Sequence, residues 1–297
     1  MCGIVGLFLK TPSLEPQLGA LLSTMLETMT DRGPDSAGFA VYGDTAAGVK
    51  LTLRGPDAGA LRTVVARLEA ATGRSYAAAA RDTHTVLTVE AAATEAVRAW
   101  LADNAPDVDV VSAGRRMEIY KEVGLPAAVA DRFDLAGMAG SHGIGHTRMA
   151  TESAVTTNGA HPFSTGLDEC LVHNGSLSNH NDLRRRLRRE GMHFATSNDT
   201  EVAAGYLSWR MRAGASLEQA LRASLTDLDG FFTFVVGTRT GFAVLRDPIA
   251  CKPAVMAETD AYVAFGSEYR ALVGLPRIES ARVFEPEPAK VYAWERH

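Results

Sequence analysis

The residue with the clearest chemical potential stands near the start of the chain. The sequence opens Met1-Cys2-Gly3 and continues into a short apolar run, 4–8. Removal of Met1 would make Cys2 the first residue, with a thiol and a free α-amine together. Because α-amines titrate near about 8, such an amine can accept the proton of its own thiol. The pattern suggests an N-terminal nucleophile. The alternatives are that Cys2 is a small apolar residue leading into a buried strand, or that Met1 stays and places the amine on the wrong residue.

Short motifs rich in polar residues and glycine follow Cys2 along most of the chain. They are DRGPDSAG at 31–38, HTRMAT at 146–151, AHPF at 160–163, HNGS at 173–176, SNDTE at 197–201, RDP at 246–248 and FGSE at 265–268. Together with the opening CGIVG, and in this order, they resemble the motifs of the class II glutamine amidotransferases. These are glutaminases of the N-terminal nucleophile hydrolase group. The resemblance covers 2–273, nearly the whole chain.

The resemblance implies a site that hydrolyses the side-chain amide of L-glutamine. Cys2 would be the nucleophile, and Asn174 and Gly175 would form the oxyanion hole. An asparagine amide and a backbone N–H can converge on one oxygen atom, so these residue types suit the task. Taken alone, an Asn-Gly pair is also the strongest short signal for a hairpin turn. The presence of Cys2 and Arg148 in the same chain favours the oxyanion hole.

The resemblance also assigns residues to the two charged groups of free glutamine. Arg148 matches the arginine that binds the α-carboxylate, a role that suits a planar guanidinium, and Thr151 adds a hydroxyl at the same place. Asp199 matches the residue that binds the α-ammonium. The simpler alternatives are a surface ion pair for Arg148 and a helix N-cap for Asp199. Arg32 and Gly33 match a loop that packs beside the nucleophile and shapes the site.

Hydrophobic periodicity predicts the elements that position these residues. Apolar residues at three- and four-residue spacing predict an amphipathic helix over 18–29, with its methionines in the core. Strands are expected at 4–8, 39–42, 48–53, 141–147, 169–173, 231–238, 241–246, 253–257 and 261–266, and helices at 179–190, 200–213 and 216–227. This order indicates stacked sheets with outer helices. The resemblance implies an α+β fold, the four-layer αββα sandwich of the N-terminal nucleophile hydrolases.

The segment 54–140 carries none of the motifs. Its helices and strands alternate, with helices expected near 57–72 and 93–104 and strands near 84–90, 108–113 and 117–123. We therefore expect an α/β insertion at 54–140 within the amidotransferase domain, either as an embellishment of the fold or as a docking site for a partner. The remainder, 274–297, is expected to form a C-terminal extension.

Composition and charge argue against several classes of protein. The 297 residues are 46% hydrophobic and 22% charged, as in a soluble globular protein, and the net charge of −5 disfavours binding to nucleic acid. No apolar run approaches the ~20 residues of a membrane span, and there is no signal peptide, so we expect a cytoplasmic protein without membrane contact. Cys2, Cys170 and Cys251 are scattered, which predicts no disulfides, and no metal-ligand spacing occurs, which predicts no metal.

The resemblance places the use of the ammonia outside this chain. The part after the last motif is shorter than the roughly 50 residues of a small domain, and no phosphate loop or dinucleotide fingerprint occurs. We therefore expect no cofactor in this chain. The insertion resembles that of stand-alone amidotransferase subunits of glutamate synthases, including N-methylglutamate synthase. This implies partner synthase subunits that carry flavin and iron–sulfur clusters. Two alternatives stay open: an N-terminal nucleophile hydrolase with another amide substrate, and a non-catalytic scaffold subunit.

Overall fold

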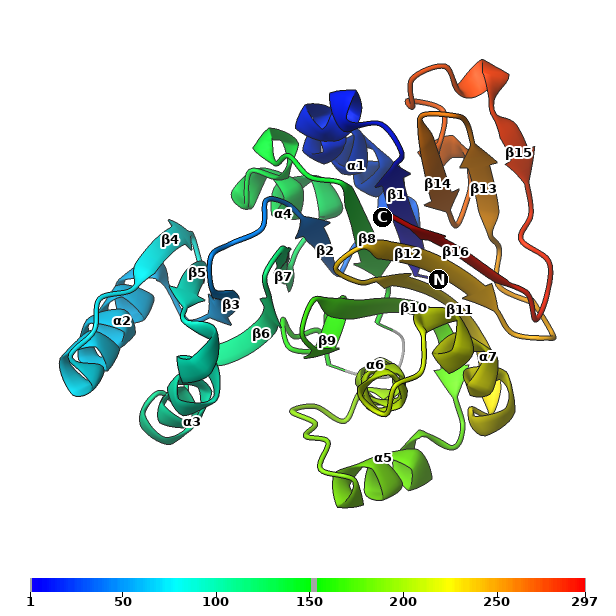
Figure 1. Ribbon diagram of the computed structural model, residues 1–297. Coiled ribbons are helices and arrows are strands. Elements are labelled where there is room, and N and C mark those ends of the chain that lie inside the picture. The colour runs from blue at the N-terminus through cyan, green and yellow to red at the C-terminus, as the bar shows by residue number, and fades with distance from the viewer. Residues whose placement is uncertain (1, 151–153, 297) are drawn as a thin grey trace.

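Figure 1 shows a computed structural model of the chain, which describes residues 2–150 and 154–296. Two β-sheets are stacked in its centre, and helices cover the outer face of each sheet. The expected four-layer αββα fold is thus confirmed. A third, smaller sheet with its own helices stands to one side.

The first central sheet is antiparallel and contains the strand that begins beside Cys2. Its strands are β1 (Gly3–Leu9), β2 (Ser36–Tyr42), β7 (Met117–Val123), β8 (His142–Arg148), β13 (Val255–Glu258), β14 (Tyr262–Gly266) and β15 (Arg282–Phe284). They are arranged in the order β15-β13-β14-β1-β8-β2-β7. β1 is therefore central, and every one of its residues is buried. Its position fixes the neighbouring Cys2 at one end of the sheet.

The second central sheet is also antiparallel and contains the Asn-Gly motif. Its strands are β9 (Phe163–Gly166), β10 (Glu169–Leu177), β11 (Gly230–Gly237), β12 (Gly241–Arg246) and β16 (Val291–Glu295), in the order β16-β12-β11-β10-β9. β10 pairs with β11 along its whole length, from Cys170 opposite Gly237 to Leu177 opposite Gly230. On its other side, β9 pairs only with the start of β10. The end of β10 that carries Asn174 therefore has an open edge.

Helices enclose the two sheets. They are α1 (Leu18–Glu27) and α4 (Pro126–Arg132) over the first sheet, and α5 (His180–Arg189), α6 (Asp199–Arg212) and α7 (Leu217–Asp227) over the second. The apolar face predicted for α1 is buried, and Met25 and Met29 belong to the core as expected. None of the helices in the described part of the chain has both the length and the apolar character needed to cross a membrane.

Apolar side chains fill three successive layers of the sandwich. The central layer lies between the two sheets and joins residues of the first, such as Ile4 and Ile144, to residues of the second, such as Val172 and Val235. The two outer layers hold the helices against the sheets. Burial of this apolar surface is the main force that stacks the sheets. It thereby sets the distance between Cys2 on one sheet and Asn174 on the other.

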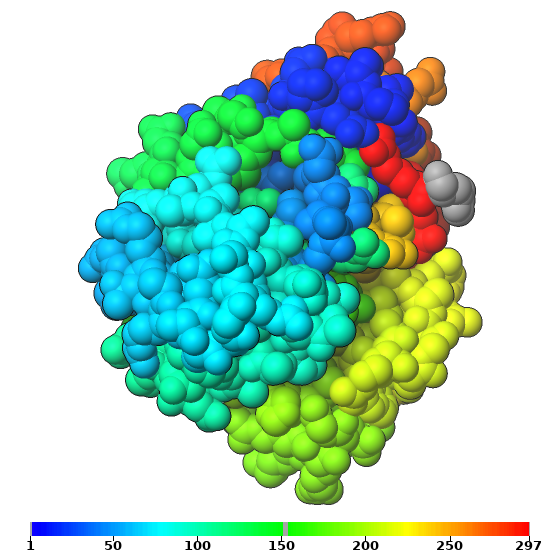
Figure 2. Space-filling view, turned by 60° about the vertical axis from the view of Figure 1, so that its left-hand side comes forward, coloured from blue at the N-terminus to red at the C-terminus, as the bar shows by residue number. Residues whose placement is uncertain are grey.

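The smaller sheet forms a separate lobe. It consists of β3 (Val49–Arg54), β4 (Ala77–Arg81), β5 (His84–Val89) and β6 (Asp109–Gly114), in the order β4-β5-β3-β6, with α2 (Ala58–Thr72) and α3 (Thr94–Asn104) packed against it. In Figure 2 this lobe, coloured light blue to cyan, covers much of the face turned toward the viewer. It has a hydrophobic core of its own, which includes Leu51, Leu61 and Leu87.

The bounds of the separate lobe and of the C-terminal part differ from those expected. The small sheet runs from Val49 to Gly114 rather than over 54–140, because Met117–Val123 pairs with β2 in the first central sheet. The chain after 274 is not an extension of the fold but part of it: β15 continues the first sheet and β16 the second. Sequence periodicity indicates a strand but not its partner, which explains both differences.

Candidate active site

The backbone of Cys2 is held by two side chains from distant parts of the sequence. Its carbonyl oxygen accepts a hydrogen bond from Arg32 Nε at 3.0 Å and one from Asn174 Nδ2 at 3.2 Å. The thiol is half-buried, and its Sγ lies 4.0 Å from the Met149 carbonyl oxygen. The residue predicted to be the nucleophile therefore lies beside the asparagine predicted to hold the oxyanion. In Figure 1 the start of β1 lies next to the second sheet.

Arg32 contacts Cys2, as the resemblance implies, and Gly33 packs against β8. Arg32 is 8% exposed, and its guanidinium also forms an ion pair with Glu268 at 2.7 Å. The hydrogen bond from Arg32 lowers the pKa of the Glu268 carboxyl, with a further contribution from Arg270. Gly33 lies so close to β8 that a Cβ atom there would overlap the backbone of Thr147. Only glycine fits at this position without a shift of the backbone.

Asn174 and Gly175 lie inside β10, so the alternative of a hairpin turn is wrong. Asn174 is 3% exposed, and Gly175 has a φ of +152° with a backbone so close to β11 that a Cβ atom would overlap the Phe231 carbonyl oxygen. Two residues later, the Leu177 N–H donates to the side chain of Asp199 and not to β11. Because the N–H groups of alternate strand residues point to the same side, the Gly175 N–H faces the open edge of β10.

Arg148 is the last residue of β8, and its side chain is buried rather than exposed at the surface. Its guanidinium donates to the Ala154 carbonyl oxygen at 3.3 Å. Asp35 fixes the backbone on either side of Met149: its N–H donates to the Arg148 carbonyl, and its carboxylate accepts from the Ala150 N–H. Thr151, predicted to act with Arg148, lies outside the described residues.

Asp199 is the first residue of α6, and the N-cap is the preceding residue, Asn198, whose side chain accepts from the Thr200 N–H at 2.8 Å. Asp199 Oδ2 instead accepts the Leu177 N–H at 3.0 Å, which ties α6 to the open edge of β10 two residues after Gly175. Among the contacts of the described residues, none joins Asp199 directly to Cys2; the link runs through β10.

Two residues of this region have structural roles that sequence reasoning missed. Glu268 orients Arg32, and Asp35 holds the chain that follows Arg148. Both residues belong to motifs described above. The sequence therefore pointed to them, but it did not show which residues they contact. Among the residues the structure describes, no group of three or more histidine, cysteine or acidic side chains is arranged to hold a metal ion.

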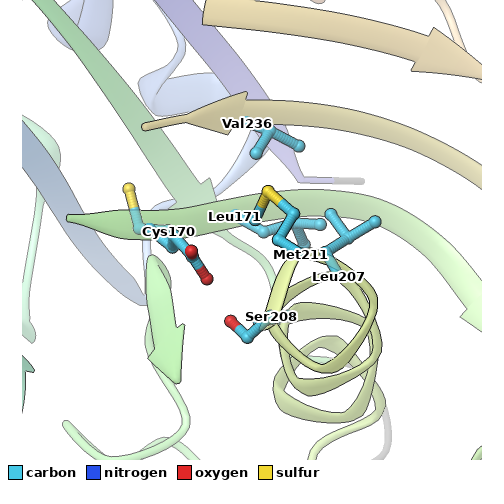
Figure 3. A pocket seen from close by; sticks show the side chains of 8 residues that line it. Cys170, Leu171, Leu207, Ser208, Met211 and Val236 are labelled. Carbon is cyan, nitrogen blue, oxygen red and sulfur yellow. The ribbon is translucent and has the colours of Figure 1, made fainter. Parts of the chain in front are cut away.

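The environment of Cys170 argues against it as an alternative nucleophile. Cys170 belongs to the lining of a small cavity of about 10 Å³ between β10 and α6, with Leu171, Leu207 and Met211 among others. In Figure 3 its sulfur atom points away from α6, and it lies 3.3 Å from Tyr42 Oη in the central layer. Burial raises the pKa of the Cys170 thiol to about 12. A thiol needs to ionise to attack, so this cysteine is unreactive at neutral pH.

The sequence is similar to those of glutamine amidotransferases. Residues 146–274 match the family described as "Glutamine amidotransferase domain". The glutamine amidotransferase-like protein GlxB of Rhizobium meliloti (strain 1021) is 65% identical over 296 residues, which cover 99% of this chain and 98% of GlxB. Glutamine–fructose-6-phosphate aminotransferase of Aliivibrio fischeri is 37% identical over 132 residues, 44% of this chain and 22% of that protein.

A solved structure shares the fold over a longer stretch. Glutamine phosphoribosylpyrophosphate amidotransferase from B. subtilis superposes with a TM-score of 0.63 and 20% identity, over 99% of this chain and 47% of that one. The chain thus spans about half the length of this structural relative. The stacked sheets between helices form the fold of the N-terminal nucleophile hydrolases. The chain belongs to the class II glutamine amidotransferases, a family with this fold.

Proposed function

We propose that this protein is a glutaminase, which hydrolyses L-glutamine to glutamate and ammonia with Cys2 as the nucleophile. The observation that carries the proposal is the 3.2 Å contact between Asn174 Nδ2 and the Cys2 carbonyl oxygen. It joins a cysteine that becomes N-terminal on removal of Met1 to an amide donor on the other sheet. An asparagine amide has two N–H groups, so a second one is available for a substrate oxygen.

The proposed reaction proceeds through a thioester. The Cys2 thiol attacks the side-chain carbonyl carbon of glutamine while its proton passes to the Cys2 α-amine. Asn174 Nδ2 and the Gly175 N–H stabilise the negative charge that develops on the oxygen. The C–N bond then breaks, and the leaving amine takes the proton from the α-ammonium and departs as ammonia. Water attacks the thioester, releases glutamate and returns a proton to the sulfur.

We propose that Arg148 and Asp199 select free glutamine by its two charges. Arg148 presents a guanidinium at the end of β8, which suits a carboxylate. Asp199 presents a carboxylate at the open edge of β10, which suits an ammonium. The competing proposal of another amide substrate makes a different prediction. A glutamine analogue that lacks either the α-carboxylate or the α-amine should not be hydrolysed if the site is a glutamine site.

The test of the nucleophile is a pair of cysteine variants. Cys2→Ala should abolish glutamate release from glutamine, whereas Cys251→Ala, which alters an exposed cysteine, should retain it. Intact-mass measurement of the active protein should show the loss of Met1. Turnover by Cys2→Ala, or by protein that retains Met1, would contradict the mechanism. Retention of Met1 together with an absence of turnover would support the scaffold alternative.

We propose further that the ammonia passes to a partner synthase of the glutamate-synthase or N-methylglutamate-synthase type, whose subunits would carry the flavin and iron–sulfur clusters. Exposed apolar side chains support a protein partner here: one ends β7 and one follows it, one begins β11, one follows β12 and one follows Glu268, all at the end of the sheets where Cys2 lies. They are Val123, Leu125, Phe231, Ile249 and Tyr269. Exposed apolar groups that gather in one region are typical of protein interfaces.

Co-purification from the native source tests the partner. Ile249→Asp should lose a flavoprotein partner that the unchanged protein retains. Leu167→Asp, which alters another strongly exposed apolar residue just before the opposite end of β10, should retain that partner. A partner that uses a sugar phosphate or a nucleotide would overturn the glutamate-synthase assignment.

A further inference from the structure

Three buried histidines and one threonine form a closed ring of contacts behind the candidate site. His161 Nδ1 lies 2.8 Å from His146 Nε2, and His161 Nε2 lies 2.8 Å from Thr200 Oγ1. Thr200 Oγ1 lies 3.0 Å from His173 Nδ1. His146 Nε2 closes the ring at 3.2 Å from the His173 carbonyl oxygen. All four side chains are at most 6% exposed.

Each ring member on a helix or strand stands next to a proposed substrate-binding or catalytic residue. His146 lies two residues before Arg148 on β8, His173 directly precedes Asn174 on β10, and Thr200 directly follows Asp199 on α6. The ring therefore connects the first sheet, the second sheet and a helix of the outer layer at one point. We propose that this ring is a positioning device that sets the separation of Arg148, Asn174 and Asp199, and that Thr200 is its key member. The inference rests on the proposed glutaminase function.

The carbonyl of His173 determines the direction of the hydrogen bonds. A carbonyl oxygen only accepts, so His146 Nε2 carries the proton. Because a neutral imidazole has one N–H, His161 Nδ1 accepts from His146, and His161 Nε2 carries the proton and donates to Thr200. The Thr200 hydroxyl proton is then within reach of His173 Nδ1 and, at 3.4 Å, of Asp199 Oδ1. With its proton on Nε2, His146 has none on Nδ1, a buried atom without a hydrogen-bond partner among the described residues.

His161 lies in a loop before β9, and a buried lysine holds that loop in place. Lys121 Nζ, from β7, donates to the carbonyl oxygens of Ala160 at 2.8 Å and Pro162 at 3.4 Å, on either side of His161. Burial lowers the pKa of Lys121 to about 8 and keeps the pKa values of the three histidines below their usual range. The imidazoles are therefore neutral at physiological pH, as the ring requires.

Replacement of the Thr200 hydroxyl tests the proposal. Thr200→Val keeps the shape but removes the donor and acceptor that join His161 to His173. It should lower kcat/KM for glutamine about 10- to 100-fold, with KM raised and kcat reduced, because both charged contacts and the oxyanion donor shift. Thr200→Ser restores the hydroxyl and should recover activity to within about threefold of the unchanged protein.

Thr52→Val is the matched control. Thr52 is equally buried and accepts a hydrogen bond from Ser112 at 2.9 Å, but it lies in the separate lobe. It should lower the urea midpoint to a similar extent and leave both kinetic constants unchanged. Equal activity of Thr200→Val and Thr52→Val would overturn the positioning role, as would failure of Thr200→Ser to rescue.

A spectroscopic measurement on the unchanged protein makes the test independent of activity. Nitrogen-15 NMR of the imidazoles should show His146 and His161 as Nε2–H tautomers at pH 7. Observation of Nδ1–H tautomers would overturn the ring as described. If these tautomers are observed but the unchanged protein does not hydrolyse glutamine, the ring stands and the proposed glutaminase function fails.

Discussion

At the scale of single residues, the backbone of Cys2 is held more firmly than its side chain. Its carbonyl accepts two hydrogen bonds, whereas the thiol has one long contact with the Met149 carbonyl. Arg32 makes the firmer arrangement possible, because its planar guanidinium binds the Cys2 carbonyl and Glu268 at the same time. A lysine offers one compact ammonium and cannot reproduce this geometry.

Arg32→Lys should therefore reduce glutamine turnover by about 10- to 100-fold, because the Cys2 backbone loses a fixed donor and the thiol shifts relative to Asn174. Steady-state kinetics of glutamate release measures the effect. Arg270→Lys is the control: Arg270 also pairs with Glu268 but is partly exposed and does not contact Cys2, so turnover should stay within about twofold of the unchanged protein. Equal losses in both variants would show that the pairing with Glu268, rather than the Cys2 contact, controls activity.

At the scale of elements, the sequence patterns correctly predicted the strands and the helix that carry the candidate site. β1, β8, β10 and α6 each combine apolar periodicity with a polar motif at one end, and each was predicted to within about four residues. Three short strands were missed, β9, β15 and β16, although β13 and β14, which are also short, were predicted. β4 has the sequence AAAAR, which has low strand propensity, and it becomes a strand only by pairing with β5.

Contacts between elements could not be predicted from the sequence. The motif residues Arg32 and Glu268 were identified, but their pairing depends on how η2 (Thr30–Arg32) and the end of β14 pack around Cys2. Likewise, the meeting of Asn174 with Cys2 depends on the stacking of two sheets by apolar side chains spread over the chain. A motif shows which residues to examine, whereas long-range packing decides which of them touch.

The N-cap of α6 gives a prediction at this scale. Asn198→Ala removes the side chain that accepts the Thr200 N–H and should lower the free energy of unfolding by about 1 kcal/mol. Because Asp199 and Thr200 form the first turn of this helix, fraying should also raise KM for glutamine. Urea unfolding and steady-state kinetics measure the two effects.

Ser216→Ala provides the comparison, because Ser216 caps α7, away from the candidate site, in a capping box with Gln219. It should cost a similar free energy of unfolding and leave KM unchanged. A rise in KM in both variants would mean that overall stability, rather than the start of α6, determines substrate affinity.

At the scale of the whole molecule, five buried histidines make the fold sensitive to acid. Burial lowers the pKa values of His84, His142 and His146 to about 3, and it also lowers those of His161 and His173. In the unfolded chain these groups titrate near 6.5. Between these limits the unfolded state binds more protons than the native state, so stability falls as the pH decreases.

Stability should therefore be fully present above about pH 6.5 and decline below it, by about 1.4 kcal/mol per pH unit for each histidine that is protonated only in the unfolded chain. A domain is usually stable by only about 5–15 kcal/mol, so acid unfolding is expected well above pH 3. Urea unfolding at a series of pH values from 8 to 4 measures the slope. A flat profile over this range would contradict the neutral, buried state of the histidines.

His84 allows the slope to be assigned to particular residues. Its ring packs edge-on against Phe133 with centroids 4.7 Å apart, and its buried Nε2 has no hydrogen-bond partner in the part of the chain that the structure describes. His84→Phe keeps an aromatic ring in this position but removes the titrating group, so the pH profile should become shallower below pH 6.5 while glutamine turnover is unchanged. If the slope stays the same, the acid sensitivity arises from the carboxylates or from the histidines behind the candidate site, and not from His84.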